Sequence, residues 1–334
     1  MGSDLPLIAA YGAGRMGRGI AHAFAYAGHA VLLIDSKPRT ARQLEETRNA
    51  ALAEVDASLA TIAALGVFDD ALRPAILQRI CFVANEEAPA ALARADVLFE
   101  GVPETTEAKR AAFAFVCRYL RCDAILASTT STMLSTELAA MVTHPERFLN
   151  AHWLNPAYLV PLVEVSPHPG SDPALVLRIR ALLEAIGKQP VVCAAAPGYI
   201  VPRFQVLFMN EAARMVEEGL ASAEDIDRAI RYGFGFRFAT MGVVEFIDYG
   251  GVDILYHASR YMSQALGDAR FAAPDIVDRH MREGRIGLKS GEGFFDYRGT
   301  DTAAYRADVV KRQVELLKYL GLVPAPDAAI DGSI

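Results

Sequence analysis

Residues 7–19 read LIAAYGAGRMGRG, and the fold class is predicted first from the pattern of these residues. An apolar run, Leu7–Tyr11, is followed at once by glycines at positions 12, 14 and 17. The next residues, Ile20–Ala27, carry small and apolar side chains at helical spacing, and a second apolar run, Ala30–Ile34, comes after them. Strand, glycine-rich turn, helix and strand in this order predict a βαβ unit in a parallel sheet that is covered on both faces.

The three glycines match the separate tasks of a dinucleotide-binding turn. Gly12 permits the tight turn, Gly14 lets a pyrophosphate approach the backbone, and Gly17 lets the helix pack closely on the strand. The helix N-terminus then supplies free N–H groups and a partial positive charge. Asp35 stands eighteen residues after Gly17, at the end of the second run. This context predicts dinucleotide binding, and the alternative is a glycine-rich turn without a ligand.

The carboxylate of Asp35 favours NAD over NADP as the cofactor. It can accept hydrogen bonds from both ribose hydroxyls of NAD, whereas it would repel the 2′-phosphate of NADP. Lys37 and Arg39 follow closely in the sequence and could weaken that repulsion.

Further short apolar runs predict more strands in the first part of the chain. They are Ile80–Val83, Val97–Gly101, Ala124–Ala127, Phe148–Ala151, Leu162–Val165 and Gln189–Cys193. Ala194–Gly198 reads as a linker, and the patterns beyond it are helical. The expected fold class is α/β, with a Rossmann-type doubly wound sheet in residues 1–195 and an all-α domain in residues 196–334.

Composition excludes several function classes. Hydrophobic residues make up 52% and charged residues 22% of the 334 residues, so the chain can bury a sizeable core. A net charge of −7 gives no field that would attract nucleic acid or an anionic membrane. No apolar run reaches the roughly 18 residues of a spanning helix, and the N-terminus lacks a signal-peptide pattern, so a cytoplasmic location is expected. The four cysteines form no CxxC pair and no zinc spacing, and no metal site is expected.

A histidine and a glutamate form the second notable constellation. His152 follows a short apolar run, and Glu164 stands twelve residues later between two valines. A buried carboxylate needs a partner, and a carboxylate beside an imidazole makes a good proton acceptor at neutral pH. The residues alone leave two interpretations open: an acid–base pair, or a structural histidine near an edge glutamate that points to solvent.

From about Pro6 to Tyr297 the chain resembles the L-3-hydroxyacyl-CoA dehydrogenase superfamily. That group includes the acyl-CoA enzymes and relatives that act on free acids, such as L-gulonate dehydrogenase (lambda-crystallin), carnitine dehydrogenase and a pyridine-carboxylate dehydrogenase. The motifs that carry the resemblance occur in family order: the glycine turn with residues 16–19 (MGRG), residues 128–131 (STTS), residues 152–156 (HWLNP) with Glu164, residues 198–201 (GYIV) and residues 291–297 (GEGFFDY).

The resemblance implies roles for individual residues. His152 would be the general base for oxidation of a secondary alcohol, Glu164 would orient it, and Ser131 would hydrogen-bond the substrate oxygen. Asn155 would shape the substrate loop. The residues that would contact NAD are Gly12, Gly14, Met16, Gly17, Asp35, Glu104, Lys109, Ser128 and Thr129. The open alternatives are a solvated helix start for Glu104 and Lys109 and a helix cap for Ser131.

The chain departs from the family pattern at several positions. Pro202 stands where the family has an asparagine near the substrate; a proline fits a first helical turn but donates no side-chain hydrogen bond. Thr129 replaces an asparagine of the Ser-Asn-Thr-Ser motif. Arg237 matches a basic residue of the free-acid relatives, and a guanidinium can bind a carboxylate through two parallel hydrogen bonds. The alternative for Arg237 is an arginine that covers the phenylalanine-rich segment around it. Residues 49–70 contain no lysine or arginine to attract a CoA phosphate.

These observations predict an NAD-dependent oxidoreductase that interconverts a free L-3-hydroxy acid and its 3-keto acid. The first alternative is a short-chain L-3-hydroxyacyl-CoA dehydrogenase, such as one for 3-hydroxybutyryl-CoA. A more remote alternative is a weakly active dinucleotide-binding or structural protein. The β-hydroxyacid dehydrogenases rank lower, because neither Lys188 nor Lys289 stands in a motif of that group. The resemblance also implies a homodimer, and a small molecule is the expected partner.

Overall fold

The computed structural model describes residues 5–323. The expectation that no signal peptide is present rests partly on residues 1–4, which lie outside this range. None of the helices in the described range combines the length and the apolar character of a membrane-spanning helix.

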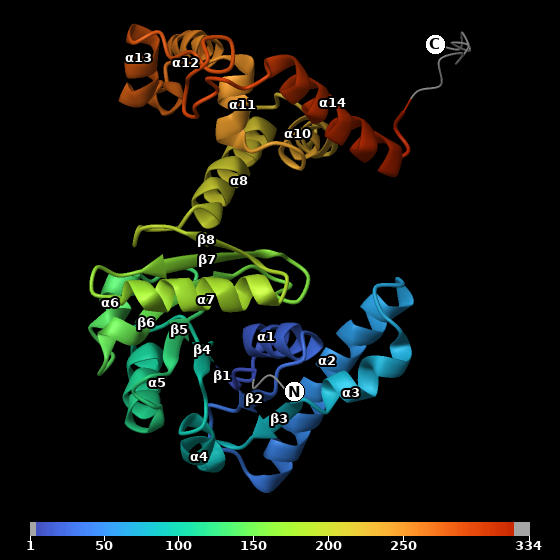
Figure 1. The fold of residues 1–334 in the computed structure, drawn as a ribbon, viewed down its shortest axis with the longest axis vertical. Helices are drawn as coiled ribbons and strands as arrows, with labels where there is room; N and C mark the ends of the chain where they lie inside the picture. Colours follow the sequence, from blue (N-terminus) through green and yellow to red (C-terminus); the bar gives the residue numbers. More distant parts are fainter. Residues whose placement is uncertain (1–4, 324–334) are drawn as a thin grey trace. The chain divides into compact units, whose positions relative to one another are not determined.

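Eight strands of the described chain form a single sheet, in the order β3-β2-β1-β4-β5-β6-β7-β8 (Figure 1). Their bounds are β1 Ile8–Tyr11, β2 Val31–Ile34, β3 Ile80–Val83, β4 Val97–Glu100, β5 Ile125–Ser128, β6 Phe148–Trp153, β7 Leu162–Pro167 and β8 Gln189–Val192. Each strand coincides with one of the eight apolar runs of the sequence. Neighbours pair in parallel except β6 and β7, which are antiparallel, and this reversal is not visible in the sequence pattern.

Helices cover both faces of the sheet, because successive residues of each strand point to opposite sides. In β1, Ile8 and Ala10 belong to one apolar cluster, and Ala9 and Tyr11 belong to the other. The first cluster packs against α1 (Arg15–Tyr26), α2 (Ala41–Ala64), α3 (Arg73–Leu77) and α7 (Pro173–Ala185). The second packs against α4 (Ala88–Leu92), α5 (Thr106–Tyr119) and α6 (Ser135–Ala139), so the sheet is doubly wound as predicted.

The carboxyl ends of the parallel strands gather the functional candidates. Gly12 follows β1, Asp35 follows β2, Gly101 follows β4 and Thr129 follows β5. Because these strands run in the same direction, the four positions share one edge of the sheet, which is where ligands bind in open α/β folds.

The chain divides into two compact units within α8 (Val201–Glu217); the first ends at Met209 and the second begins at Asn210. The domain boundary expected after residue 195 stays a prediction. The second unit is helical, with α9 Ala223–Ala229, α10 Phe236–Phe238, α11 Val243–Gly250, α12 Val252–Leu266, α13 Asp275–Arg282 and α14 Thr302–Tyr319. A doubly wound sheet followed by helices confirms the expected fold class.

A buried aspartate fixes residues 291–297 (GEGFFDY) within the second unit. The Asp248 carboxylate is fully buried and accepts hydrogen bonds from the backbone N–H groups of Phe294 (3.0 Å) and Phe295 (2.8 Å). A Cβ at Gly293 would collide with this carboxylate. The segment therefore packs within its own unit.

Lys188, just before β8, secures the turn after β6. Its ammonium is buried and donates hydrogen bonds to the carbonyls of Ala157 (2.7 Å) and Val160 (2.8 Å). It also lies 5.6 Å from the centroid of the Trp153 ring. Burial lowers the pKa of Lys188 to about 8, because desolvation disfavours the charged form.

The lowered pKa of Lys188 predicts a specific pH dependence of stability. Between about pH 8 and pH 10.4 the unfolded chain holds the lysine proton more tightly than the folded one, so the free energy of unfolding rises with pH. Relative to Lys188→Met, the wild type should therefore gain up to about 3 kcal/mol over this range. Urea unfolding of both proteins at several pH values measures the gain, and parallel curves would contradict it.

Candidate active site

The glycine turn leaves an open space in front of α1. Gly12 has a φ of 113°, and a Cβ there would lie 2.7 Å from the carbonyl oxygen of Gly101. A Cβ at Gly17 would collide with the carbonyl oxygen of Gly12, so helix and turn need both glycines. A Cβ at Gly14 would meet nothing within 4 Å. Tight packing at two glycines and free space at the third fit a turn that a ligand approaches.

A cavity of about 470 Å³ extends from this turn. Asp35 lines it; its carboxylate is buried and accepts hydrogen bonds from the N–H of Lys37 (3.2 Å) and from Nε of Arg39 (2.8 Å). The guanidinium of Arg39 thus partly neutralises the carboxylate that is expected to bind the ribose. Other residues that line the cavity include Gly12, Gly14, Met16, Val102, Glu104, Thr129 and Ser131.

These residues fit NAD. Backbone N–H groups at the start of α1 suit a pyrophosphate, since the first turn of a helix has no internal partners for them. A carboxylate at the end of β2 suits ribose hydroxyls. The predicted cofactor residues Gly12, Gly14, Met16, Asp35, Glu104 and Thr129 all line this one cavity, whereas Gly17 supports the packing behind it.

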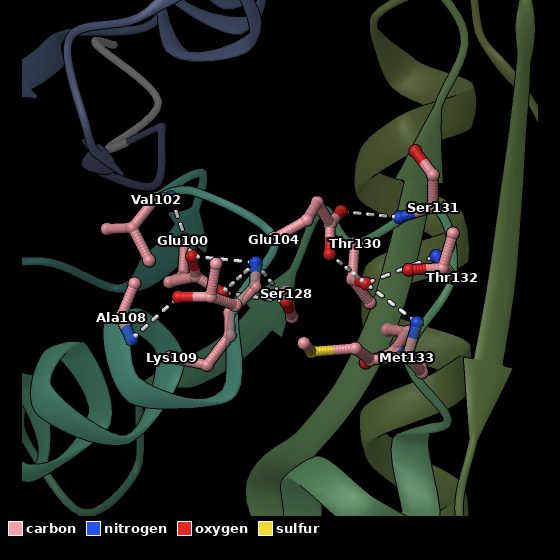
Figure 2. A network of polar contacts seen from close by, with 12 residues as sticks. Glu100, Val102, Glu104, Ala108, Lys109, Ser128, Thr130, Ser131, Thr132 and Met133 are labelled. Atoms are coloured by element: carbon pink, nitrogen blue, oxygen red, sulfur yellow. Dashed lines mark hydrogen bonds and ion pairs between the residues drawn. The ribbon is translucent and has the colours of Figure 1, made fainter.

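Lys109 and Ser128 belong to a different arrangement (Figure 2). The Lys109 ammonium is almost fully buried and lies 3.0 Å from both carboxylate oxygens of Glu100. The Ser128 hydroxyl donates to the same carboxylate at 2.7 Å, and the N–H of Val102 donates to it at 2.7 Å. Within the described chain, neither Lys109 nor Ser128 lines the cavity. Their contact with NAD stays a prediction that this geometry does not support.

Glu100 is a residue that the sequence reasoning missed. Its signal was available, since Glu100 is an acidic residue inside the run Val97–Gly101 and must find a partner when it is buried. The resemblance implies that Lys109 contacts the cofactor, whereas in the structure its ammonium forms an ion pair with Glu100.

Glu104 instead holds the turn after β5 (Figure 2). Its carboxylate accepts hydrogen bonds from Thr130 Oγ1 (2.7 Å) and from the N–H of Ser131 (2.7 Å). Thr130 Oγ1 in turn accepts from the N–H groups of Thr132 and Met133. The exposed Ser131 is therefore held at the cavity wall by a defined network.

His152 and Glu164 face each other across two strands. Residues 152 and 164 are directly paired in the antiparallel β6–β7 ladder, and Nδ1 of His152 lies 2.8 Å from Oε2 of Glu164. Both side chains are buried. A carboxylate is only an acceptor, so the hydrogen bond places the proton on Nδ1 and leaves Nε2 as the basic nitrogen.

The second carboxylate oxygen of Glu164 binds the start of α8. Oε1 accepts hydrogen bonds from the N–H groups of Ile200 and Val201, each at 2.8 Å. Burial by itself raises the pKa of Glu164, but the hydrogen bonds from His152, Val201 and Ile200 outweigh it and lower the pKa below its ordinary value. The carboxylate stays ionised beside the imidazole.

Three other predicted positions lie elsewhere. Asn155 precedes a cis peptide bond to Pro156 and lines a second cavity of about 240 Å³ together with Arg15 and Arg18. Arg237 belongs to the second unit, where its guanidinium lies 5.4 Å from the centroid of the Phe246 ring. Phe246 lies outside the phenylalanine-rich segment around Arg237, and the substrate contact of Arg237 stays a prediction. Pro202 occupies the first turn of α8, as its ring geometry allows.

No group of three or more potential metal ligands occurs among the described residues. Lys289, one of the two lysines considered as an alternative catalytic residue, forms an exposed ion pair with Asp253 at 2.6 Å.

Comparisons with protein families decide the assignment. Residues 7–196 match the model of the 3-hydroxyacyl-CoA dehydrogenase NAD binding domain, and residues 198–297 match the model of the 3-hydroxyacyl-CoA dehydrogenase C-terminal domain. The chain belongs to the 3-hydroxyacyl-CoA dehydrogenase family. It is accordingly an NAD-dependent oxidoreductase of this family, and the predicted recognition and cofactor are confirmed.

Similar proteins include a dehydrogenase named for a pyridine carboxylate and dehydrogenases named for acyl-CoA thioesters. A 5-formyl-3-hydroxy-2-methylpyridine 4-carboxylate 5-dehydrogenase of Mesorhizobium japonicum is 30% identical over 94% of this chain and 97% of its own. A 3-hydroxybutyryl-CoA dehydrogenase of Bradyrhizobium diazoefficiens is 32% identical over 90% of this chain and 98% of its own. The crystal structure of a 3-hydroxyacyl-CoA dehydrogenase from Archaeoglobus fulgidus has a TM-score of 0.75 and 31% identity, and covers 96% of this chain and 100% of its own.

The buried pair of Glu100 and Lys109 gives a test of its structural role. Lys109→Met leaves a buried carboxylate without its counter-charge and should lower the free energy of unfolding by about 3–5 kcal/mol. The exposed pair of Arg42 and Glu46 supplies a matched control, since Arg42→Met should cost less than about 1 kcal/mol. Urea unfolding measures both. A stable Lys109→Met protein that binds NAD weakly would instead favour the cofactor role.

Proposed function

We propose that the protein oxidises a free L-3-hydroxy acid to its 3-keto acid, and catalyses the reverse reduction, with His152 as the acid–base residue. The observation that carries the proposal is the buried His152–Glu164 hydrogen bond, whose carboxylate is also fixed by two backbone N–H groups. An imidazole held in one tautomer by an ionised carboxylate is suited to take a proton from a hydroxyl group.

In the oxidation, each residue of the site has a separate role. Bound NAD supplies the acceptor for the hydride that leaves the carbinol carbon. Nε2 of His152 takes the hydroxyl proton, and the electron pair of the broken O–H bond forms the carbonyl. Glu164 stabilises the imidazolium that results. Ser131 supplies a hydroxyl for the substrate oxygen, and Asn155 shapes the neighbouring loop. In the reduction, the imidazolium returns the same proton.

Charge around α2 supports a free acid over a CoA thioester. The segment 49–70 carries acidic residues and no basic ones, and two arginines near it, Arg73 and Arg18, have carboxylate partners. Arg73 binds Asp56 (2.6 Å) and Asp70 (2.8 Å), and Arg18 forms an ion pair with Glu54. Cations that already have carboxylate partners attract a phosphate weakly. The acyl-CoA alternative keeps the support of relatives that are named 3-hydroxybutyryl-CoA dehydrogenases.

Two further expectations remain predictions beside the reaction. One is a homodimer, which is supported by exposed apolar residues on α8 such as Leu207 and Met209. The other is a cytoplasmic location.

The role of His152 is tested with the purified wild type, His152→Gln and Glu164→Gln. We expect NADH formation from L-3-hydroxybutyrate, L-gulonate or L-carnitine, and a loss in kcat of at least about 100-fold in His152→Gln, because the base is gone. The kcat of Glu164→Gln should lie between those of the wild type and His152→Gln. Full activity of His152→Gln would remove His152 as the base, and an inactive wild type would favour the dinucleotide-binding alternative.

The role of Arg237 separates the two substrate classes. If its guanidinium binds the substrate carboxylate, Arg237→Met should raise KM for the free acid by at least about tenfold and leave KM for 3-hydroxybutyryl-CoA nearly unchanged. Arg306→Met is the control, because Arg306 also lies over an aromatic ring of the second unit, 5.0 Å from the Tyr249 centroid. Turnover of the CoA thioester alone would overturn the preference for a free acid.

A further inference from the structure

An unusual backbone conformation lies next to the acid–base pair. Tyr199 has a φ of 44° and is the one residue other than glycine with positive φ among the described residues. Bulky side chains rarely adopt this region, and such conformations persist only where the surroundings hold them. They occur preferentially at functional sites, so the contacts of Tyr199 are informative.

The ring of Tyr199 lies flat on the imidazole of His152. The two ring centroids are 5.0 Å apart and the ring planes differ by 1°. The hydrogen bond from Nδ1 to Glu164 fixes one point of the imidazole but still allows the ring to tilt about that point. A flat neighbour restricts the tilt, so the two contacts together define where Nε2 points.

The hydroxyl of Tyr199 ties the tyrosine to two other segments. It donates a hydrogen bond to the carbonyl of Thr130 (3.0 Å) and accepts one from Nδ2 of Asn150 (3.0 Å). Asn150 is fully buried in β6, two residues before His152, and its amide also donates to the carbonyl of Met133 (2.9 Å). The carbonyls of Thr130 and Met133 flank Ser131, so both ends of its turn are held.

The backbone of Tyr199 also helps to bind the carboxylate of Glu164. The left-handed conformations at Gly198 and Tyr199 turn the chain so that the next two N–H groups, of Ile200 and Val201, reach Glu164. Tyr199 thus has three contacts. Its ring stacks on the imidazole of His152, and its hydroxyl binds the turn that contains Ser131. Its backbone directs the N–H groups that donate to the Glu164 carboxylate.

We propose that Tyr199, together with Asn150, is a positioning residue that fixes His152 and Ser131 relative to one another. The inference rests on the proposed roles of those two residues. It adds Tyr199 and Asn150 as the pair that fixes the imidazole of His152 relative to the hydroxyl of Ser131, so that a single alcohol oxygen of the substrate can contact both groups.

The kinetic test compares three single variants and the double variant Tyr199→Phe/Asn150→Ala. Tyr199→Phe keeps the ring and removes the hydroxyl, and we expect kcat to fall about fivefold. Tyr199→Leu removes both, and a misplaced base should lower kcat about 100-fold. Asn150→Ala should resemble Tyr199→Phe, and the double variant should lose little more than either single one, because both remove the same hydrogen bond. KM for NAD should change less than about twofold in all of them, since the glycine turn is untouched.

The matched control is Tyr119→Phe, which makes the same atomic change in α5, where Tyr119 packs on Phe115 with 5.3 Å between ring centroids. It should leave kcat unchanged. Equal losses in Tyr119→Phe and Tyr199→Phe would overturn the proposal, as would an unchanged kcat in Tyr199→Phe. If Tyr199→Leu fails to fold, Tyr199→Phe and Asn150→Ala still decide the question.

A second measurement does not depend on turnover. The proton on Nδ1 of His152 gives a downfield NMR signal while it is held against Glu164, and the signal is assigned by its loss in His152→Gln. We expect it to broaden through solvent exchange in Tyr199→Leu and to persist in Tyr199→Phe. An unchanged signal in Tyr199→Leu overturns the positioning role. If the signal responds as expected but the wild type oxidises no hydroxy acid, the positioning of the imidazole stands and the proposed function fails.

Discussion

The carboxylate of Glu164 is the group on which the rest of the site depends. It is fully buried in the sheet, where an unpaired charge would be very costly. Each of its oxygens has partners: Oε2 faces the imidazole of His152, and Oε1 accepts from two N–H groups at the start of α8. The antiparallel register of β6 and β7 places the glutamate opposite the histidine, so the fold itself brings the pair together.

Glu100 is a second buried acid, and its charge is compensated by a partner with a structural role. Glu100 ends β4 as Glu164 lies within β7, and it is equally buried. Its counter-charge is the ammonium of Lys109, and the hydroxyl of Ser128 and the N–H of Val102 complete the shell. The partner of Glu100 is the ammonium of Lys109, and a protonated amine cannot accept a proton. The partner of Glu164 is instead an imidazole, whose Nε2 is a basic nitrogen when Nδ1 holds the proton, so the pair of His152 with Glu164 is the one suited to proton transfer.

The sequence predicted the elements whose signals are local. All eight strands follow from apolar runs, and the cofactor turn follows from the spacing of Gly12, Gly14 and Gly17 together with Asp35. The ion pair of Lys109 with Glu100 could not be predicted from spacing, because nine residues separate the two and the contact depends on how α5 packs beside the end of β4. The reversal at β7 and the stacking of Tyr199 on His152 depend on packing between segments far apart in the chain, for which a single sequence carries no signal.

The central claim is that His152 takes the proton of a substrate hydroxyl while Glu164 holds its other nitrogen. A crystal structure of the protein with NAD and an L-3-hydroxy acid tests it most directly. We expect the 3-hydroxyl oxygen about 2.6–3.2 Å from Nε2 of His152, with Nδ1 still on Glu164. A hydroxyl group bound to another side chain, with His152 turned away from it, would show that His152 is not the base.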